Sequence, residues 1–458
     1  MFELSAAARA IGARHLGADA RIMRVTTDSR DARSGDLFVA LKGPRFDGHG
    51  FVDQALAAGA VAALVMDTGA VKTEGARLLA VADTRLGLGK LAAWWRGRFD
   101  IPLVAVTGSN GKTTVKEMLA AILRVHAGEA GVLATAGNLN NDIGVPLTLL
   151  RLEARHRYAV IEMGMNHLGE IAYLSRLARP TAAIINNAGT AHIGEVGSVE
   201  AIARAKGEIL EGLSAEGVAI INGDDAFSDY WRQLARGRRL VDFGLDRRAT
   251  VTGRYELGEA GSLLTLATPQ EEVVVRLAVP GVHNVRNALA AATAAWSAGV
   301  PSAHIAAGLF EYKGSSGRLT QLQLPSGALL IDDTYNANPE SMKAALSVLA
   351  GCAGRRIFVM GDMGELGEAT GAMHAEIGVF ARRAGAHSLY ALGDASAGAA
   401  RAFGEGAAHF DSIEALVSAL APELGPGCAV LVKGSRFMRM ERVVEALSAR
   451  VTSARGHH

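Results

Sequence analysis

The residues best suited to chemistry lie in segment 106–114, which reads Val-Thr-Gly-Ser-Asn-Gly-Lys-Thr-Thr. Glycines such as Gly108 and Gly111 let backbone N–H groups converge on phosphate oxygens, and Lys112 supplies a full positive charge. The hydroxyl of Thr113 would bind Mg²⁺. The segment therefore predicts a phosphate-binding loop. The alternative is a glycine turn followed by a surface lysine.

The elements around this loop favour the prediction, although the strict Walker pattern has glycine where Val106 stands. A buried-strand pattern covers residues 103–107. Helical periodicity covers residues 113–125, so a helix N-terminus adds partial positive charge at the loop. Further apolar runs, separated by helical patterns, cover residues 158–162, 182–186 and 218–222. This alternation predicts a parallel sheet covered by helices on both faces.

Two polar side chains follow strands of this predicted sheet. Glu162 ends the run 158–162, and His192 follows the next strand. Because the carboxyl ends of parallel strands meet at one edge of a sheet, we expect both side chains near the phosphate loop. The alternatives are that Glu162 is an acid exposed to solvent at the strand end and that His192 has only a structural role. Lys206, on a predicted helix, would be a surface lysine on the local sequence alone.

Three further residues suit a nucleotide. Asn284 and Asn287 stand at the start of a predicted helix, and their amides can pair with an adenine edge. The alternative for Asn284 is helix capping. Arg318 follows Gly317 and offers a fixed guanidinium for an ATP phosphate.

After about residue 312 the alternation of strands and helices restarts, which predicts a second doubly wound unit. Its predicted strands are 329–332, 356–360 and 429–432, and its predicted helices are 339–349 and 438–449. Asn338 and Pro339 suit the cap and first residue of the first helix. Segment 433–438 carries two cations at the start of a predicted helix, an arrangement that could bind an anion. The alternative is that basic residues simply begin this helix.

The first 100 residues or so predict a small α/β unit. Its predicted strands are 37–41, 60–66 and 78–81, and a helix is predicted over 52–58. Ser29 and Arg30 would by themselves be turn residues.

The composition narrows the class of protein. The 458 residues carry 47 Lys+Arg against 46 Asp+Glu, so no basic surplus indicates nucleic acid or an anionic membrane as a partner. No segment reads as a signal peptide or membrane span. The two cysteines, Cys352 and Cys428, lie far apart, which favours a reducing compartment.

The spacing Thr-Gly-Ser-Asn-Gly-Lys-Thr-Thr resembles the Mur ligase and folylpolyglutamate synthase superfamily. Segments 27–30, 35–43 and 47–51 are spaced like the UDP-sugar domain of muramoyl ligases. Segments 137–146, 162–166, 335–339 and 360–367 also resemble Mur ligases. The resemblance implies an α/β fold of three domains. These are a UDP-muramoyl substrate-binding domain (1–100), a central ATP-binding P-loop domain with a doubly wound parallel sheet (101–313) and a C-terminal Rossmann-like ligase domain (314–458).

The resemblance also implies roles for residues that match the family's motifs. The implied catalytic residues are Lys112, Lys206, His192 and Arg318. The implied ligands of two Mg²⁺ ions are Thr113, Glu162, His192 and Lys206, the last as a carbamate (N6-carboxylysine). The implied ATP contacts are Gly108, Asn110, Gly111, Lys112, Thr113, Thr114, Asn284, Asn287, Arg318 and Asp333. The implied substrate contacts are Ser29, Arg30, Asn138, Asn141, Asn336, Asn338, Lys433 and Ser435.

The implied activity is ATP-dependent amide-bond formation in peptidoglycan synthesis, which joins D-alanyl-D-alanine to UDP-N-acetylmuramoyl-tripeptide in a cytoplasmic monomer. Because Lys112 and Arg318 belong to different domains, the site is expected to be complete only when these domains close. Three alternatives are another ligase of the superfamily, a P-loop switch without ligase chemistry and a nucleotide-sugar binding protein. Folate ligases begin close to the phosphate loop, whereas about 100 residues precede it here.

Overall fold

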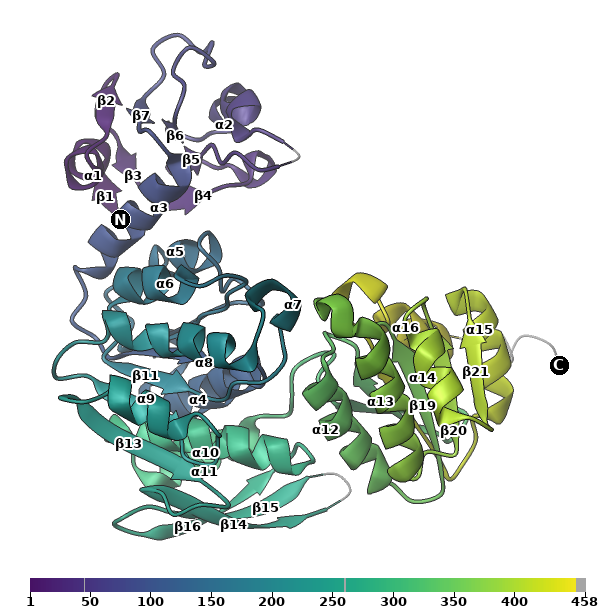
Figure 1. The fold of residues 1–458 in the computed structure, drawn as a ribbon. Coiled ribbons are helices and arrows are strands. Elements are labelled where there is room, and N and C mark those ends of the chain that lie inside the picture. Colours follow the sequence, from purple (N-terminus) through teal and green to yellow (C-terminus); the bar gives the residue numbers. More distant parts are fainter. Residues whose placement is uncertain (45, 259–260, 450–458) are drawn as a thin grey trace.

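The computed structural model describes residues 1–44, 46–258 and 261–449. Figure 1 shows three α/β units in chain order, with the first and the third each beside the second. Each unit is built around its own sheet, of five, nine and six strands. The α/β fold with three units that the sequence predicts is therefore confirmed.

The first unit has a sheet in the order β2-β7-β6-β5-β4. Strands β4 to β7 run parallel, and β2 pairs antiparallel with β7. Helix α3 leads to the second unit and packs on its helices α5 and α6. The elements are β1 (Phe2–Glu3), α1 (Leu4–Ile11), β2 (Arg14–Leu16), β3 (Arg21–Ile22), β4 (Arg24–Thr26), β5 (Asp36–Val39), α2 (Val52–Ala57), β6 (Ala62–Val65), β7 (Leu78–Ala80) and α3 (Thr84–Arg96).

The second unit contains the predicted parallel sheet, in the order β13-β12-β11-β8-β10-β9. The register pairs Glu162 with Val106 and Ile185 with Thr107, so β10, β8 and β11 end level with one another. This level edge holds the loop after β8 next to the ends of its neighbours. The strands are β8 (Leu103–Thr107), β9 (Val132–Ala134), β10 (Tyr158–Glu162), β11 (Ala182–Ile185), β12 (Val218–Asn222) and β13 (Arg239–Gly244).

Helices cover both faces of this sheet, because its strands are apolar on both sides. One face packs on α4 (Lys112–Ala127), α10 (Val282–Ser297) and α11 (Ser302–Glu311). The other face carries the helices α5 (Gly144–Leu149), α6 (Glu170–Ala178), α8 (Val199–Gly207) and α9 (Ser228–Leu234). The short α7 (Ile193–Val196) follows β11 at the edge that carries the phosphate loop.

The sheet continues beyond β13 in a way that the sequence prediction missed. Strand β14 (Val251–Leu257) pairs antiparallel with β15 (Ser262–Ala267), which pairs antiparallel with β16 (Glu272–Leu277). Leu264 and Leu266 of β15 are fully buried and alternate with half-buried residues, so one face of this extension packs on the core. Half-buried antiparallel strands show this alternation instead of a continuous apolar run.

The third unit has a sheet in the order β17-β18-β22-β19-β20-β21, parallel except for β17. Its strands are β17 (Thr320–Gln323), β18 (Leu329–Asp333), β19 (Arg355–Gly361), β20 (Ser388–Leu392), β21 (Ala407–Phe410) and β22 (Cys428–Lys433). Its helices are α12 (Pro339–Ala350), α13 (Thr370–Arg383), α14 (Ser396–Phe403), α15 (Ile413–Leu420) and α16 (Glu441–Ala449). The last helix begins after the predicted residue 438, because residues Arg436–Met438 form a 3₁₀ turn and Arg439 has a left-handed backbone.

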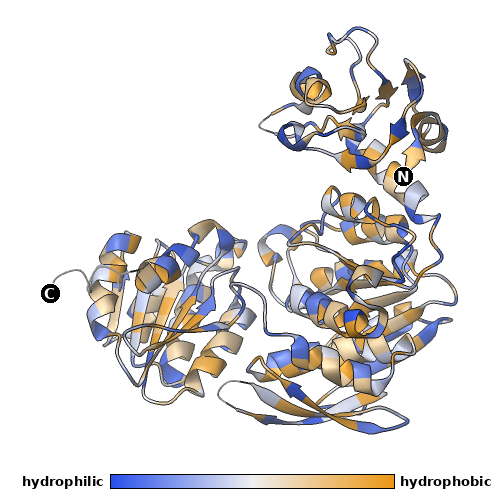
Figure 2. Cartoon of the chain, turned by 180° about the vertical axis from the view of Figure 1, so that it is seen from behind, coloured by the Kyte–Doolittle hydropathy of each residue, from blue (hydrophilic) through white to orange (hydrophobic). Residues whose placement is uncertain are grey.

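Figure 2 shows hydrophobic residues concentrated along the strands that the helices cover. Across the described ranges, none of the helices has the length and apolarity needed to cross a membrane.

Candidate active site

The phosphate loop lies between β8 and α4, as predicted, and amide side chains from other elements shape it. The Asn110 N–H donates to Asn187 Oδ1 at 2.8 Å, and Asn186 Nδ2 donates to the Asn110 carbonyl at 3.0 Å. Gly111 caps α4 with a φ of +79°. A Cβ at Gly111 would lie 2.3 Å from Asn287 Oδ1, so only glycine fits at this position.

Lys112 and Arg318 bring two cations to this loop from different units. The Lys112 ammonium donates to the carbonyls of Gly108 at 2.7 Å and Ser109 at 3.2 Å. Burial lowers the pKa of Lys112, with Glu162 acting against the shift and Arg318 adding to it. Arg318 Nη2 donates to Thr113 Oγ1 at 3.0 Å, and its guanidinium stacks 4.1 Å from the Tyr335 ring centroid. The third unit therefore meets the phosphate loop at Thr113, the second residue of α4.

Glu162 is held in place at the end of β10. Its backbone N–H donates to Thr135 Oγ1 at 2.9 Å, and Asn140 Nδ2 donates to Glu162 Oε1 at 2.7 Å. The other oxygen, Oε2, is buried and has no hydrogen-bond partner among the described residues. A carboxylate oxygen in that state is suited to a cation, because a buried charge is costly unless it is paired.

Lys206 is fully buried near the end of α8, which excludes the surface-lysine alternative. Its Nζ atom has no hydrogen-bond partner within the described ranges. Burial holds the pKa of Lys206 well below its usual value, and the charge of Lys112 lowers it further. The neutral amine is therefore favoured at this position.

His192 follows β11 with a left-handed backbone, φ +66°, and caps α7. Its Nδ1 atom is buried and lies 2.7 Å from Glu365 Oε2 of the third unit. The contact with the His192 side chain lowers the pKa of the Glu365 carboxyl.

Two further contacts join the second and third units beside the loop. Asn338 caps α12 with Pro339 as the first helical residue, which confirms the predicted cap. Its Nδ2 atom also donates to Asn110 Oδ1 at 2.8 Å. Glu340 accepts from the Thr190 N–H at 3.0 Å and from Thr190 Oγ1 at 2.8 Å.

The adenine candidates Asn284 and Asn287 are buried in the first turns of α10. The residue that caps α10 is Gly281, so Asn284 does not cap this helix. Asn284 Nδ2 instead donates to the Pro280 carbonyl at 2.8 Å, and Asn287 Oδ1 accepts from Asn186 Nδ2 at 3.1 Å. Asn287 thus lies directly against the phosphate loop.

Several predicted contacts in the third unit already have partners within the chain. The buried Lys433 ammonium donates to Asp333 Oδ2 at 2.5 Å and to the Asn336 carbonyl at 2.8 Å. The other Asp333 oxygen accepts from the Leu319 N–H at 3.1 Å. Ser435 Oγ accepts from the Gly364 N–H at 2.8 Å. These residues therefore join the carboxyl ends of β18 and β22 to the loops that follow β18 and β19.

The remaining substrate candidates lie in the first unit and in the loop between β9 and α5. Ser29 and Arg30 occupy a 3₁₀ turn of the first unit, where Asp28 holds the Arg30 guanidinium at 2.7 Å. Asn138 is exposed, and Asn141 Oδ1 accepts from the Gly144 N–H at 2.9 Å. Ser29 and Arg30 thus belong to the first unit, whereas Asn138 and Asn141 flank Asn140, whose side chain donates to Glu162.

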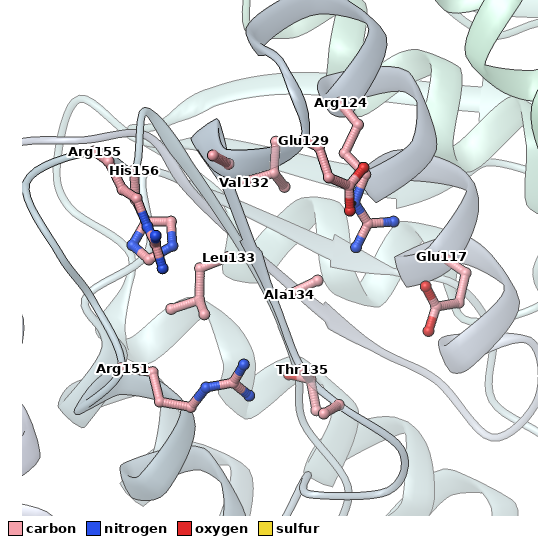
Figure 3. A pocket seen from close by; sticks show the side chains of 12 residues that line it. Glu117, Arg124, Glu129, Val132, Leu133, Ala134, Thr135, Arg151, Arg155 and His156 are labelled. Carbon is pink, nitrogen blue, oxygen red and sulfur yellow. The ribbon is translucent and has the colours of Figure 1, made fainter. Parts of the chain in front are cut away.

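A cavity of about 490 Å³ opens elsewhere, beside β9 at the edge of the large sheet. Figure 3 shows Arg151, Arg155 and His156 on one side of this strand and Glu117 and Arg124 on the other. None of the twelve residues that line it is a predicted site residue. Charged side chains at a sheet edge discourage pairing with another strand.

The sequence analysis missed the residues that orient the predicted ones, namely Asn140, Asn186, Asn187, Glu340 and Glu365. The segments 137–146 and 360–367 contain two of them, so their place in a family motif was a usable signal. Asn186 and Asn187 follow β11 directly, where the carboxyl end of a parallel strand favours site residues.

Comparisons with known proteins match all three units. The Mur ligase family catalytic domain matches residues 21–96, the Mur ligase middle domain 106–295, and the Mur ligase glutamate ligase domain 317–436. The UDP-N-acetylmuramoyl-tripeptide–D-alanyl-D-alanine ligase of Escherichia coli K12 is 45% identical over 94% of this chain and 95% of its own.

Solved structures agree with this match. MurF from Acinetobacter baumannii has a TM-score of 0.90 at 39% identity, over 97% of this chain and 98% of its own. MurF ligase from Thermotoga maritima, solved in complex with ADP, has a TM-score of 0.84 at 29% identity, over 94% of this chain and 98% of its own. On these matches, the chain belongs to the Mur ligase family.

Proposed function

We propose that this protein is an ATP-dependent ligase of peptidoglycan synthesis. It joins the amine of D-alanyl-D-alanine to the terminal carboxylate of UDP-N-acetylmuramoyl-tripeptide and releases ADP and phosphate. The observation that carries the proposal is the near full-length likeness to the Escherichia coli enzyme of that name, combined with an intact phosphate loop. The ADP complex of the Thermotoga maritima neighbour supports the use of ATP.

The chemistry explains why such an enzyme needs ATP. A carboxylate is a poor electrophile because its negative charge is delocalised. One carboxylate oxygen attacks the γ-phosphorus of ATP, ADP leaves, and an acyl phosphate forms. The amine then attacks the acyl carbon, phosphate leaves, and the nitrogen loses a proton. No protein nucleophile takes part, so the chain contributes positioning and charge stabilisation.

Lys112 and Arg318 are the cations suited to the transferring phosphoryl group. They approach Thr113 and the loop from two units, so the pair exists only while those units are in contact. Closure also excludes water, which would otherwise hydrolyse the acyl phosphate. We assign Asn284, Asn287 and Asp333 to the nucleotide, and Asn336 and Asn338 to the side from which the amine enters.

Mg²⁺ fits the residues around the loop. Glu162 Oε2 and His192 Nδ1 are both buried and have no hydrogen-bond partner among the described residues. No group of three or more His, Cys, Asp or Glu within residues 1–44, 46–258 and 261–449 could hold a metal by itself. Mg²⁺ usually takes one or two carboxylates and completes its shell with phosphates and water. Bound there, it would neutralise the developing phosphoryl charge.

Lys206 is suited to carry a carbamate. The neutral amine adds to the carbon of CO₂, and the nitrogen loses a proton, which leaves an acidic group on a long stem. Burial already favours the neutral amine, and the nearby charge of Lys112 would stabilise the new anion. The carbamate would then join Glu162 and His192 as a cation ligand.

The first unit is proposed to bind the UDP end of the tripeptide substrate, with Ser29 and Arg30 as its contacts and Asn138 and Asn141 nearer the reaction centre. Lys433 and Ser435 would shape the acceptor side, through Asp333 and Gly364.

The test measures phosphate release from ATP and Mg²⁺ with each substrate alone and with both, together with the mass of the nucleotide product. The proposal expects release and a UDP-muramoyl pentapeptide only when both substrates are present. ATP hydrolysis that ignores D-alanyl-D-alanine would favour a P-loop switch and would remove the ligase assignment.

A further inference from the structure

Segment 433–438, which by its sequence could bind an anion, keeps one cation open to solvent. The Lys433 ammonium is buried and paired with Asp333 Oδ2 at 2.5 Å. The exposed Arg436 guanidinium instead donates through Nη1 alone, to Glu441 Oε1 at 3.1 Å, and its Nε and Nη2 atoms bind no acceptor among the described residues. A guanidinium has five N–H donors in a planar fork, so Arg436 can hold a second carboxylate beside Glu441.

The turn that carries Arg436 lies against the segment proposed to face the incoming amine. The Arg436 backbone N–H donates to Asn336 Oδ1 at 3.4 Å. Two residues further on, Asn338 Nδ2 donates to Asn110 Oδ1 in the phosphate loop at 2.8 Å. A chain advances by at most ~3.6 Å per residue, so the backbones of Asn336 and Asn338 lie no more than ~7 Å apart. Asn336 is therefore within one dipeptide length of the residue that touches the phosphate loop.

A second contact places the same turn beside the boundary with the second unit. The exposed ring of Phe437 lies against Gly364, where an added Cβ would come within 3.0 Å of it. The carbonyl of the next residue, Glu365, accepts from the Gly194 N–H at 2.9 Å, across that boundary. The turn 436–438 therefore lies next to a loop of the third unit that meets the second.

The proposed acceptor needs a cation in this position. D-alanyl-D-alanine has an amine at one end and a free carboxylate at the other, ~7 Å away when the dipeptide is extended. The amine must approach the acyl carbon at the phosphate loop, so the carboxylate must lie about one dipeptide length from it. Arginine suits this group because its fork donates two parallel N–H bonds to the two carboxylate oxygens.

We propose that Arg436 binds the terminal carboxylate of D-alanyl-D-alanine and thereby selects an acceptor with a free carboxyl end. This inference rests on the proposed function, because it needs that dipeptide as the acceptor. Glu441 holds Nη1 and so fixes the guanidinium, while Nε and Nη2 remain for the substrate. The contact with Asn336 keeps the turn beside the segment on the amine side.

Arg442 provides a matched control. Its guanidinium also pairs with a single carboxylate, Glu414 of α15, at 3.6 Å. The side chains of Arg436 and Arg442 are 65% and 54% exposed, so glutamine at either position removes one exposed positive charge. Arg442 belongs to α16 and lies outside the turn 436–438, so Arg442→Gln leaves the proposed carboxylate contact in place.

The test compares D-alanyl-D-alanine with its C-terminal amide, which keeps the amine and both methyl groups but lacks the carboxylate. Formation of the UDP-linked product at saturating ATP and tripeptide gives kcat/KM for each acceptor. Both acceptors meet the same variant, so general damage to the enzyme cancels in the ratio of the two values. Wild type is expected to prefer the acid by about tenfold or more, as for loss of a hydrogen bond to a charged group.

Arg436→Gln should lower kcat/KM for the acid by a similar factor, through a higher KM, and leave the value for the amide within about twofold of wild type. The preference for the acid then disappears. Arg436→Lys keeps the positive charge and should keep part of the preference, because a lysine cannot reproduce the paired N–H bonds. Arg442→Gln should keep all of it.

An unchanged preference in Arg436→Gln, or an equal loss with both acceptors in that variant, would overturn the inference while leaving the ligase reaction in place. So would a wild-type enzyme that uses the acid and the amide equally well, or a preference lost to the same degree in Arg442→Gln. A wild-type chain that forms no pentapeptide would instead remove the proposed function, and the role of Arg436 with it.

Discussion

The two glycines at the ends of α4 allow the shape of the phosphate loop to be tested. Gly111 and Gly128 both have a positive φ, but Gly111 is left-handed helical (φ +79°, ψ −5°) and Gly128 is not (φ +82°, ψ 154°). A Cβ at Gly111 would lie 2.3 Å from Asn287 Oδ1 and 2.7 Å from Asn186 Nδ2, whereas a Cβ at Gly128 meets nothing within 4 Å. The pair Gly111→Ala and Gly128→Ala therefore separates backbone strain from crowding at the loop.

Backbone strain costs about 1–2 kcal/mol for an alanine at Gly111 in the left-handed helical region, and about 1–3 kcal/mol at Gly128, whose backbone region is adopted almost only by glycine. Gly111→Ala also disturbs the hydrogen bond between Asn186 and Asn287, worth about 1 kcal/mol, and crowds a packed site at about 1–3 kcal/mol. We therefore expect Gly128→Ala to lower the free energy of unfolding by about 1–3 kcal/mol and Gly111→Ala by roughly 3–6 kcal/mol.

The assay is calorimetry of the full chain, in which the transition that ADP shifts belongs to the nucleotide-binding unit. Isothermal titration then gives the ADP affinity of each variant. Gly111→Ala should lose ADP affinity, and Gly128→Ala should keep it. Equal destabilisation of both variants, or full ADP affinity in Gly111→Ala, would refute the argument that the asparagines close tightly around this loop.

Three further outcomes are expected. Lys112→Ala should abolish turnover while the melting temperature stays near that of wild type. Asn338→Ala and Ser412→Ala should each lose about 1 kcal/mol with their helix caps, but only Asn338→Ala, which also loses its contact with Asn110, should raise the KM for ATP. Burial lowers the pKa of His283 to about 4, so stability should fall as the pH drops from about 6.5 toward 4, by no more than about 3 kcal/mol. Urea unfolding of His283→Gln at both ends of that range should show a smaller difference than wild type.

The local pattern predicted the elements that position the site. Continuous apolar runs marked β8, β10, β11 and β12, and the glycine-rich segment after β8 marked the phosphate loop. The strands and the loop could be predicted because each depends on residues adjacent in the sequence. A strand buried on both faces, for example, must be apolar throughout. The antiparallel strands β14 to β16 were missed, because they are only partly buried and polar or charged residues interrupt their apolar runs.

The sequence could not predict which side chains meet across units. Glu365 lies 173 positions after His192 in the sequence, and Lys433 lies 100 positions after Asp333. The spacing of residues within a short motif therefore could not predict either contact. The sequence indicated that Lys433 could bind an anion at a helix start, whereas its ammonium is paired with Asp333 in the structure. The burial of Lys206 is likewise a product of packing between α8 and its neighbours, and its local sequence reads as a solvated helix.

The proposed reaction depends most on activation of the tripeptide carboxylate by ATP. The direct measurement uses UDP-N-acetylmuramoyl-tripeptide with heavy oxygen in its terminal carboxylate and follows the mass of the phosphate released during turnover with D-alanyl-D-alanine. If an acyl phosphate forms, one labelled oxygen leaves with the phosphate, and each turnover yields one labelled phosphate. Unlabelled phosphate alongside a genuine pentapeptide product would contradict the mechanism, because the carboxylate would then have been joined without being phosphorylated.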